Sequence, residues 1–219
     1  SDLKKLTKIN SNKLVQEENN MNWMQKDVQT SAQMEIAWQC APVLTGVKPS
    51  NILTLKNVSE KEVAESLKEM GISYSMLCDS GVRKVWLIYR EEEILEILGK
   101  KEYSEFLDTL GYRGFEFPQM LQIMNLRFEG YQHGSAEFPH ELGIFLGYPL
   151  ADVKGFIEHN GKDFLYQGYW KVYENVEERK KMFSIYNVVK EEFIREMQAG
   201  KDLWHAARSV RQPFDIQPA

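Results

Sequence analysis

Two residues that suit acid–base chemistry stand side by side in a segment otherwise rich in aromatic residues, 138–173. They are His140 and Glu141. A short helix is expected over 139–146, which would place both residues in its first turn. Unpaired N–H groups and the helix dipole favour an anion there and lower the pKa of a nearby histidine. The competing interpretation is that Glu141 helps to cap the helix and His140 fills a polar notch.

A second group of candidates lies near the end of a helix expected to begin at Ser31. Cys40 would supply a thiolate nucleophile or a soft metal ligand if a histidine stood beside it. The alternative is that Cys40 and Cys78 are small, buried apolar side chains. We therefore expect one small-molecule-binding or enzymatic site. Its catalytic candidates are Cys40, His140 and Glu141, and its candidates for contacting a ligand or cofactor are Lys48, Lys171 and Tyr169.

Sequence motifs for metals and common cofactors are absent. The chain has two cysteines and no CxxC, HxxxH or HExxH pair, so no metal site is predicted. Its glycines do not follow the dinucleotide, P-loop or GxSxG patterns. The sequence therefore identifies no cofactor.

The elements that must position these residues alternate between helix and strand. Ile72, Tyr74, Met76 and Cys78 alternate as in a half-buried strand, and the run over 82–90 predicts the next strand, so the two form a hairpin. Further strands are expected over 51–56 and 164–173. The remaining helices are predicted over 59–70, 91–98, 101–110, 118–128, 150–159 and 175–198.

This order predicts an α+β fold. A small mixed, partly antiparallel sheet of three to four strands would have a helical majority packed against it. We expect a polar N-terminal arm over 1–30, a single domain over 31–200 and a C-terminal tail over 201–219. A chain of 219 residues is long enough to bury a core without disulfides.

Charge and hydropathy narrow the partners that we expect. The net charge is −5 and the pI is about 5.5, which gives no support for binding nucleic acid or an anionic membrane. No apolar run suits a signal peptide or a membrane span, so a cytoplasmic location is expected. A small-molecule ligand is the first expectation. The alternative is a non-enzymatic protein–protein interaction or regulatory module that uses residues 139–173. The sequence predicts no oligomeric state.

Three blocks carry a family resemblance: CAPVLTGVKPSNIL near the front, FPHELGIFLGYPLADVKGFI, and GYWKVY. Over about residues 37–193 the chain resembles the bacterial family known as domain of unknown function 3793. The resemblance implies no established activity. It implies a link to redox or iron homeostasis, because such proteins occur in anaerobic bacteria, sometimes beside flavodoxin or ferrous-iron uptake genes. Many relatives have histidine where Gln39 stands, and a cysteine associated with the segment before GYWKVY is replaced here by Gln167 or its neighbours. Both departures argue against a metal or thiol site.

Overall fold

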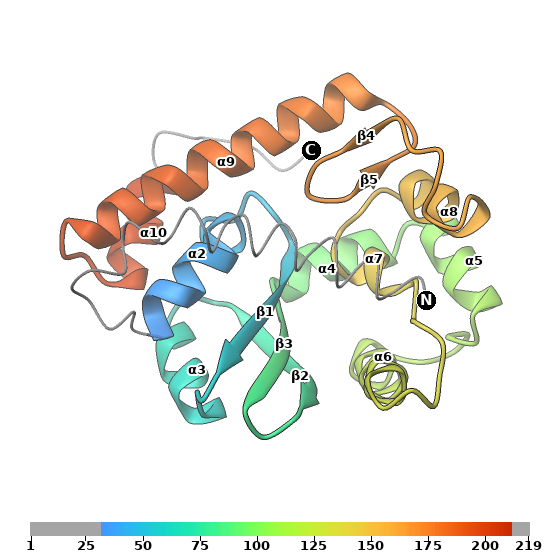
Figure 1. Cartoon of the computed structure of the whole chain (residues 1–219), viewed down its shortest axis with the longest axis horizontal. Coiled ribbons are helices and arrows are strands. Elements are labelled where there is room, and N and C mark those ends of the chain that lie inside the picture. Colours follow the sequence, from blue (N-terminus) through green and yellow to red (C-terminus); the bar gives the residue numbers. More distant parts are fainter. Residues whose placement is uncertain (1–31, 212–219) are drawn as a thin grey trace.

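The computed structural model describes residues 32–211, so the predicted arm over 1–30 lies outside the described residues. The predicted α+β class is confirmed, with helices in the majority (Figure 1). The elements are α2 (Ala32–Leu44), β1 (Ser50–Lys56), α3 (Glu60–Leu67), β2 (Ser73–Asp79), β3 (Arg83–Tyr89), α4 (Glu91–Leu98), α5 (Lys101–Thr109), α6 (Phe117–Gln132), α7 (Leu142–Phe145), α8 (Leu150–Glu158), β4 (Tyr166–Gln167), β5 (Lys171–Val172), α9 (Val176–Gln198) and α10 (Leu203–Arg211).

The sheet has three strands in the order β1-β3-β2, with β3 in the centre. Both pairings are antiparallel, and Tyr89 of β3 lies opposite Ser50 of β1 and Ser73 of β2. β4 and β5 pair with each other as a separate hairpin. The short β2–β3 connection explains the antiparallel pairing, because parallel strands need a long crossover.

Alternate residues of β3 build two hydrophobic clusters, one on each face of the sheet. Trp86 and Ile88 face a cluster formed with α2, α3, α9 and α10. Val85, Leu87 and Tyr89 face a second cluster formed with α4 to α8. Figure 1 shows α2 and α3 on one side of the sheet and α6 and α7 on the other. The central strand is therefore apolar on both faces.

A bulge in β2 breaks the alternation that the sequence suggests. Met76 lies opposite Trp86, but the next paired residue, Cys78, lies opposite Val85. Leu77 is the extra residue, and one extra residue moves everything after it to the other face. Met76 therefore packs against the first cluster, whereas Cys78 packs against the second.

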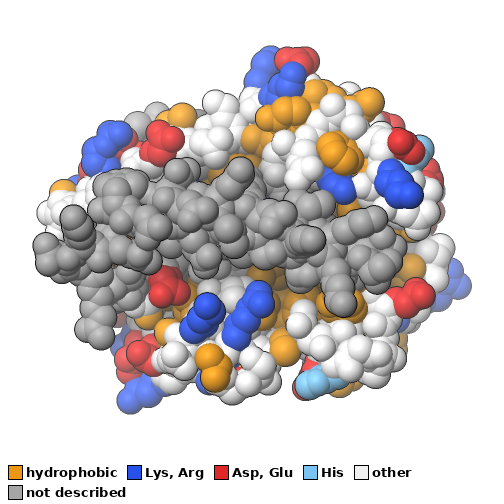
Figure 2. Space-filling view, viewed as in Figure 1, with side chains coloured by type: hydrophobic (Ala, Val, Ile, Leu, Met, Phe, Trp, Pro, Cys, Tyr) orange, Lys and Arg blue, Asp and Glu red, His pale blue; other side chains and the backbone are white. Residues whose placement is uncertain are grey.

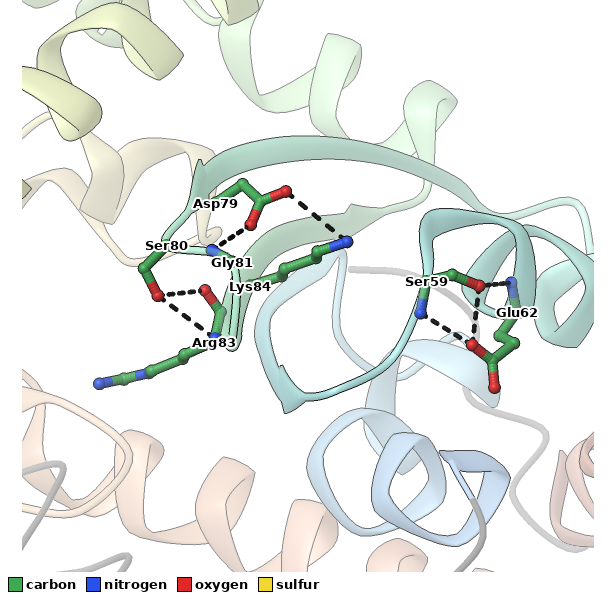
Figure 3. A network of polar contacts seen from close by, with 7 residues as sticks. All are labelled: Ser59, Glu62, Asp79, Ser80, Gly81, Arg83 and Lys84. Atoms are coloured by element: carbon green, nitrogen blue, oxygen red, sulfur yellow. Dashed lines mark hydrogen bonds and ion pairs between the residues drawn. The ribbon is translucent and has the colours of Figure 1, made fainter.

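Two polar motifs fix the ends of these strands and helices (Figure 3). In the β2–β3 turn, the Gly81 amide donates to Asp79 Oδ1 over 2.7 Å, and Lys84 lies 3.6 Å from the same carboxylate. Gly81 has a φ of +82°, which a residue with a Cβ adopts with strain. Before α3, Ser59 and Glu62 form a capping box: the Glu62 amide donates to Ser59 Oγ, and the Glu62 carboxylate accepts from the Ser59 amide.

The first half of the segment predicted as a tail, 201–219, forms α10. Ala206 and Val210 are buried there against α2 and α9. Val189 and Phe193 of α9 are fully buried in the same cluster. α9 and α10 therefore close the face of the sheet that α2 begins to cover.

The single strand predicted over 164–173 is wrong. The chain turns at Gly168, so that β4 and β5 form a hairpin closed by the Gly168 amide donating to the Trp170 carbonyl. A Cβ on Gly168 would lie 2.2 Å from the Phe183 ring of α9. This glycine therefore lets the hairpin turn directly on the long helix.

No helix in residues 32–211 is long and apolar enough to cross a membrane. Within the same range, no three His, Cys, Asp or Glu side chains come together as metal ligands. On the described part of the face drawn in Figure 2, Lys and Arg side chains lie close to Asp and Glu side chains.

Candidate functional site

Lys48 is held at the junction of α2 and β1 by its own backbone. Its amide donates to the carbonyl of Pro42 over 3.0 Å, and the Val47 amide donates to the same oxygen. Arg90, which follows β3, donates to the Val43 and Leu44 carbonyls and so completes the end of α2. The helix end, the strand start and Lys48 therefore form one rigid corner.

The Lys48 amine lies inside the protein, with the residue only 3% exposed. Nζ donates to the Ser50 carbonyl over 2.5 Å and to Asn51 Oδ1 over 2.9 Å. Among the described residues, no carboxylate lies within ion-pair distance of it. The two acceptors match the two N–H groups of a neutral amine, whereas an ammonium would have a third proton to place.

Burial lowers the pKa of Lys48 to about 7, because the loss of hydration outweighs the opposing electrostatic effect of Cys40. Burial also raises the pKa of the neighbouring Cys40 thiol to about 12, although Lys48 and a hydrogen bond from Asn51 act in the opposite direction. Both groups are thus biased toward their neutral forms. A thiol of this kind is a poor nucleophile, because thiol reactivity requires the thiolate. Of the two, the amine is the group suited to chemistry.

Asn51 connects the amine to the edge of the sheet. Its Nδ2 donates to the Gln39 carbonyl over 2.7 Å. The Gln39 side chain in turn accepts from the Thr54 amide and donates to the Thr54 carbonyl, each over 2.9 Å. This chain of hydrogen bonds fixes α2 along the outer edge of β1, and it fixes the acceptor that Lys48 uses.

The connection between α7 and α8 covers the same corner. Gly147 lies directly on Pro49, because a Cβ on Gly147 would stand 2.3 Å from the Pro49 ring. The Tyr148 ring that follows has Lys48 Nζ 5.7 Å from its centre and stacks on Trp170 with 4.5 Å between centroids. Val47, Asn51 and Tyr148 are only partly buried. The amine therefore borders two partly exposed residues, Asn51 and Tyr148.

The helix predicted over 139–146 is shorter than expected. α7 has four residues and begins at Leu142; His140 and Glu141 form the turn that leads into it, and the Glu141 side chain does not cap the helix. Glu141 is 4% exposed and accepts hydrogen bonds from the Tyr112 hydroxyl, over 3.0 Å, and from Arg127. A buried carboxylate requires such a charged partner. Glu141 is therefore directed toward α6 and the α5–α6 connection rather than toward a helix terminus.

Two other predicted site residues, His140 and Lys171, lie near the same aromatic ring, that of Phe156. His140 lies 5.5 Å from the Phe138 ring and 5.6 Å from the Phe156 ring. Lys171 lies 5.7 Å from the same Phe156 ring and donates to the Gly161 carbonyl. The structure thus places His140 and Lys171 on one ring, and it places Cys40 next to Lys48.

Tyr169 belongs to the packing of the hairpin on α9. Its hydroxyl donates to Asn187 Oδ1 over 3.0 Å, and its ring contacts Phe183 and Tyr186. These contacts attach the hairpin to the helix, and Tyr169 shares a hydrophobic cluster with Val47 and Tyr148 of the Lys48 corner.

Asn51 and Tyr148 were missed as partners of Lys48, although one signal points to this lysine. Lys48 is the only charged residue between Glu35 and Lys56. A lone charge in an apolar stretch of this length favours burial, and a buried lysine has an altered pKa.

The family model described as "Protein of unknown function (DUF3793)" matches residues 36–205. The chain belongs to this family. Comparisons with curated proteins and with solved structures gave no match. The matched range runs from α2 into α10 and includes every residue of the Lys48 corner. The family assignment brings no activity with it, so the function must be argued from the site.

Proposed function

We propose that the protein binds a small molecule at the Lys48 corner and acts on it through the Lys48 amine, as a base or a nucleophile. The observation that carries this proposal is a buried amine that donates to two acceptors, the Ser50 carbonyl and Asn51 Oδ1. In the described part of the chain, no carboxylate lies within ion-pair distance of this amine. Lysines that act as bases or nucleophiles are activated in this way, by loss of hydration. Placing a lysine in such a position costs stability, and a function is one reason to retain it.

Competitive acetylation tests the proposal. The folded protein would be treated at pH 7 with a trace of acetic anhydride, and each lysine quantified after digestion. We expect Lys48 to react at least as fast as the exposed Lys101, because only a neutral amine reacts and an ordinary lysine in water is almost fully charged at pH 7. Acetylation of Lys48 only after unfolding would show that the amine has a purely structural role.

The alternative of an interaction module receives weaker support. Leu165 is 66% exposed and Phe164 is 37% exposed, so the start of the hairpin does present apolar surface. Trp170, however, is 8% exposed and donates to Asp152 rather than facing a partner. The aromatic residues of the hairpin are mostly used in packing on α9, which leaves little of the surface that this alternative needs.

A further inference from the structure

The shape of the hydrogen bonding around Lys48 restricts what the amine can bind. Ser50 and Asn51 accept its two N–H groups, and within residues 32–211 no further donor or acceptor is bonded to Nζ. The nitrogen lone pair is therefore the group left for a ligand. A lone pair in this state attacks electron-poor carbon, and it gives little affinity for an anion.

The surroundings favour an uncharged electrophile. The amine is bonded to the Ser50 carbonyl and the Asn51 amide, lies 5.7 Å from the centre of the Tyr148 ring, and interacts electrostatically with the Cys40 thiol. A phosphate or carboxylate would meet one weakly charged amine, whereas anion sites combine several donors. The Arg90 guanidinium of this corner already donates to the Val43 and Leu44 carbonyls and lies 3.8 Å from Glu93. A small aldehyde or ketone would bring a carbonyl carbon to the lone pair without burying a second charge.

We propose that the ligands of this site are small uncharged aldehydes or ketones, and that Lys48 Nζ forms an imine with their carbonyl carbon. This inference rests on the proposed function and names its substrate class. Nζ attacks the carbonyl carbon, and the C=O electron pair moves to oxygen. The two amine protons then leave with that oxygen as water, and a C=N bond remains. Uptake of one proton gives an iminium, whose single N–H the Asn51 Oδ1 or the Ser50 carbonyl accepts.

Reductive trapping tests this step. The folded protein would be incubated at pH 7 with propionaldehyde, or with hydroxyacetone, and sodium cyanoborohydride, which reduces the C=N bond to a stable amine. Intact mass and peptide mapping would report the site. We expect one rapid adduct at Lys48, at least ten-fold faster than at Lys101, because the neutral fraction at pH 7 is about 10³-fold larger for a lysine of pKa 7 than for one of pKa 10.5.

Two variants separate the chemistry from folding. Lys48→Met removes the amine, and its rapid adduct should be lost. Asn51→Asp keeps the shape and the acceptor but adds a carboxylate beside Nζ. That charge should hold the amine protonated and slow trapping at pH 7 about ten-fold or more, with recovery as the pH is raised. Circular dichroism and urea unfolding would establish that each variant is folded. An unchanged rate in a folded Asn51→Asp protein overturns the proposal.

The remaining outcomes distinguish this inference from the proposed function. Adducts spread evenly over the exposed lysines, with none favoured at Lys48, overturn imine formation. If Lys48 is nevertheless acetylated in the folded protein, the amine is accessible. The proposed function then stands, but its ligands are not aldehydes or ketones. If Lys48 resists both reagents until the protein unfolds, both proposals fail.

Discussion

The Gln39 side chain pairs with the backbone of Thr54 in both directions, accepting from its amide and donating to its carbonyl. β1 is an edge strand, because the sheet order is β1-β3-β2. The amide of Gln39 thus takes the place that the backbone of one residue from a further strand would occupy. Edge strands need such protection, since their unpaired groups otherwise invite pairing with another chain.

Replacing Gln39 by histidine should lower the free energy of unfolding by about 1–3 kcal/mol. An imidazole has its two nitrogens on different edges, so it can keep at most one of the two bonds to Thr54. Urea unfolding followed by circular dichroism would measure the loss. Gln122 on α6 is exposed and offers a matched control, for which Gln122→Ala should change stability by no more than about 0.5 kcal/mol. Equal stability of the two variants would contradict this interpretation of Gln39.

Lys48 should make the protein more stable as the pH rises from 7 toward 8. Its pKa is about 7 in the folded state against 10.5 for a free lysine, so the unfolded chain binds more protons in this range. Stability then increases with pH, by at most about 1.4 kcal/mol per unit. The Cys40 thiol has the opposite effect on stability. Its pKa is raised in the folded protein, so above its ordinary pKa of 9.0 stability falls as the pH rises, and the effect of Lys48 is best measured below pH 9.

The measurement compares wild type with Lys48→Met by urea unfolding at pH 7.0, 7.5 and 8.0. The difference between the two proteins should change with pH, whereas Lys101→Met should follow wild type in parallel, because Lys101 is exposed. Parallel behaviour of Lys48→Met as well would mean that the folded protein keeps Lys48 charged.

Asp152→Asn should destabilise the protein by about 3–5 kcal/mol. The Asp152 carboxylate is 2% exposed and accepts from Trp170 Nε1 over 2.7 Å and from the Tyr173 amide over 2.7 Å, and Arg179 Nε lies 3.8 Å away. An asparagine would leave Arg179 with only the exposed Glu178 carboxylate, 3.3 Å away, and would point an N–H donor at the groups that donate to Asp152. Urea unfolding measures the loss.

The control for Asp152 is Asp163→Asn. Asp163 is exposed, and its φ of +54° suits asparagine, so the change in stability should stay within about 0.5 kcal/mol. A similar loss in both variants would indicate a general effect of removing a negative charge rather than the buried contacts of Asp152.

Cys78 should react with a thiol reagent in the folded protein well before Cys40. Cys40 is fully buried and its thiol pKa is raised to about 12, whereas Cys78 is partly exposed in β2. Labelling with Ellman's reagent should give one fast thiol, absent in Cys78→Ser, and a second only after urea is added. Fast labelling that persists in Cys78→Ser would mean that solvent reaches Cys40, and with it the neighbourhood of Lys48.

The parts of the fold that follow from local patterns could be predicted from the sequence. The apolar run of β3 and the Ser59–Glu62 capping box are examples, because each depends on neighbours within a few residues. The turn at Gly168 could not be predicted, because what requires a glycine there is the ring of Phe183, a contact made only after α9 has packed. The bulge at Leu77 is similar, since alternation alone gives no sign of an extra residue.

For the candidate site, residue types alone pointed to the side chains suited to chemistry. The sequence did not show which of these side chains lie together in the fold. Cys40 and Lys48 do lie together, held by the end of α2 and the start of β1. Glu141 instead accepts from Arg127, a residue of α6 that nothing in the local sequence connects with it. Pairings of this kind depend on tertiary packing, which spacing along the chain does not report.

α9 is in contact with both ends of the molecule. Over its 23 residues, about 34 Å, it packs on the hairpin through Phe183 and Tyr186 and on α2 and α10 through Val189 and Phe193. Neither end can lose its packing without exposing part of the same helix. Unfolding should therefore be cooperative across the described residues, and a chain cut before Val176 would leave the apolar surfaces of both ends uncovered. We therefore expect the three-stranded sheet of the described residues and the small hairpin to unfold together.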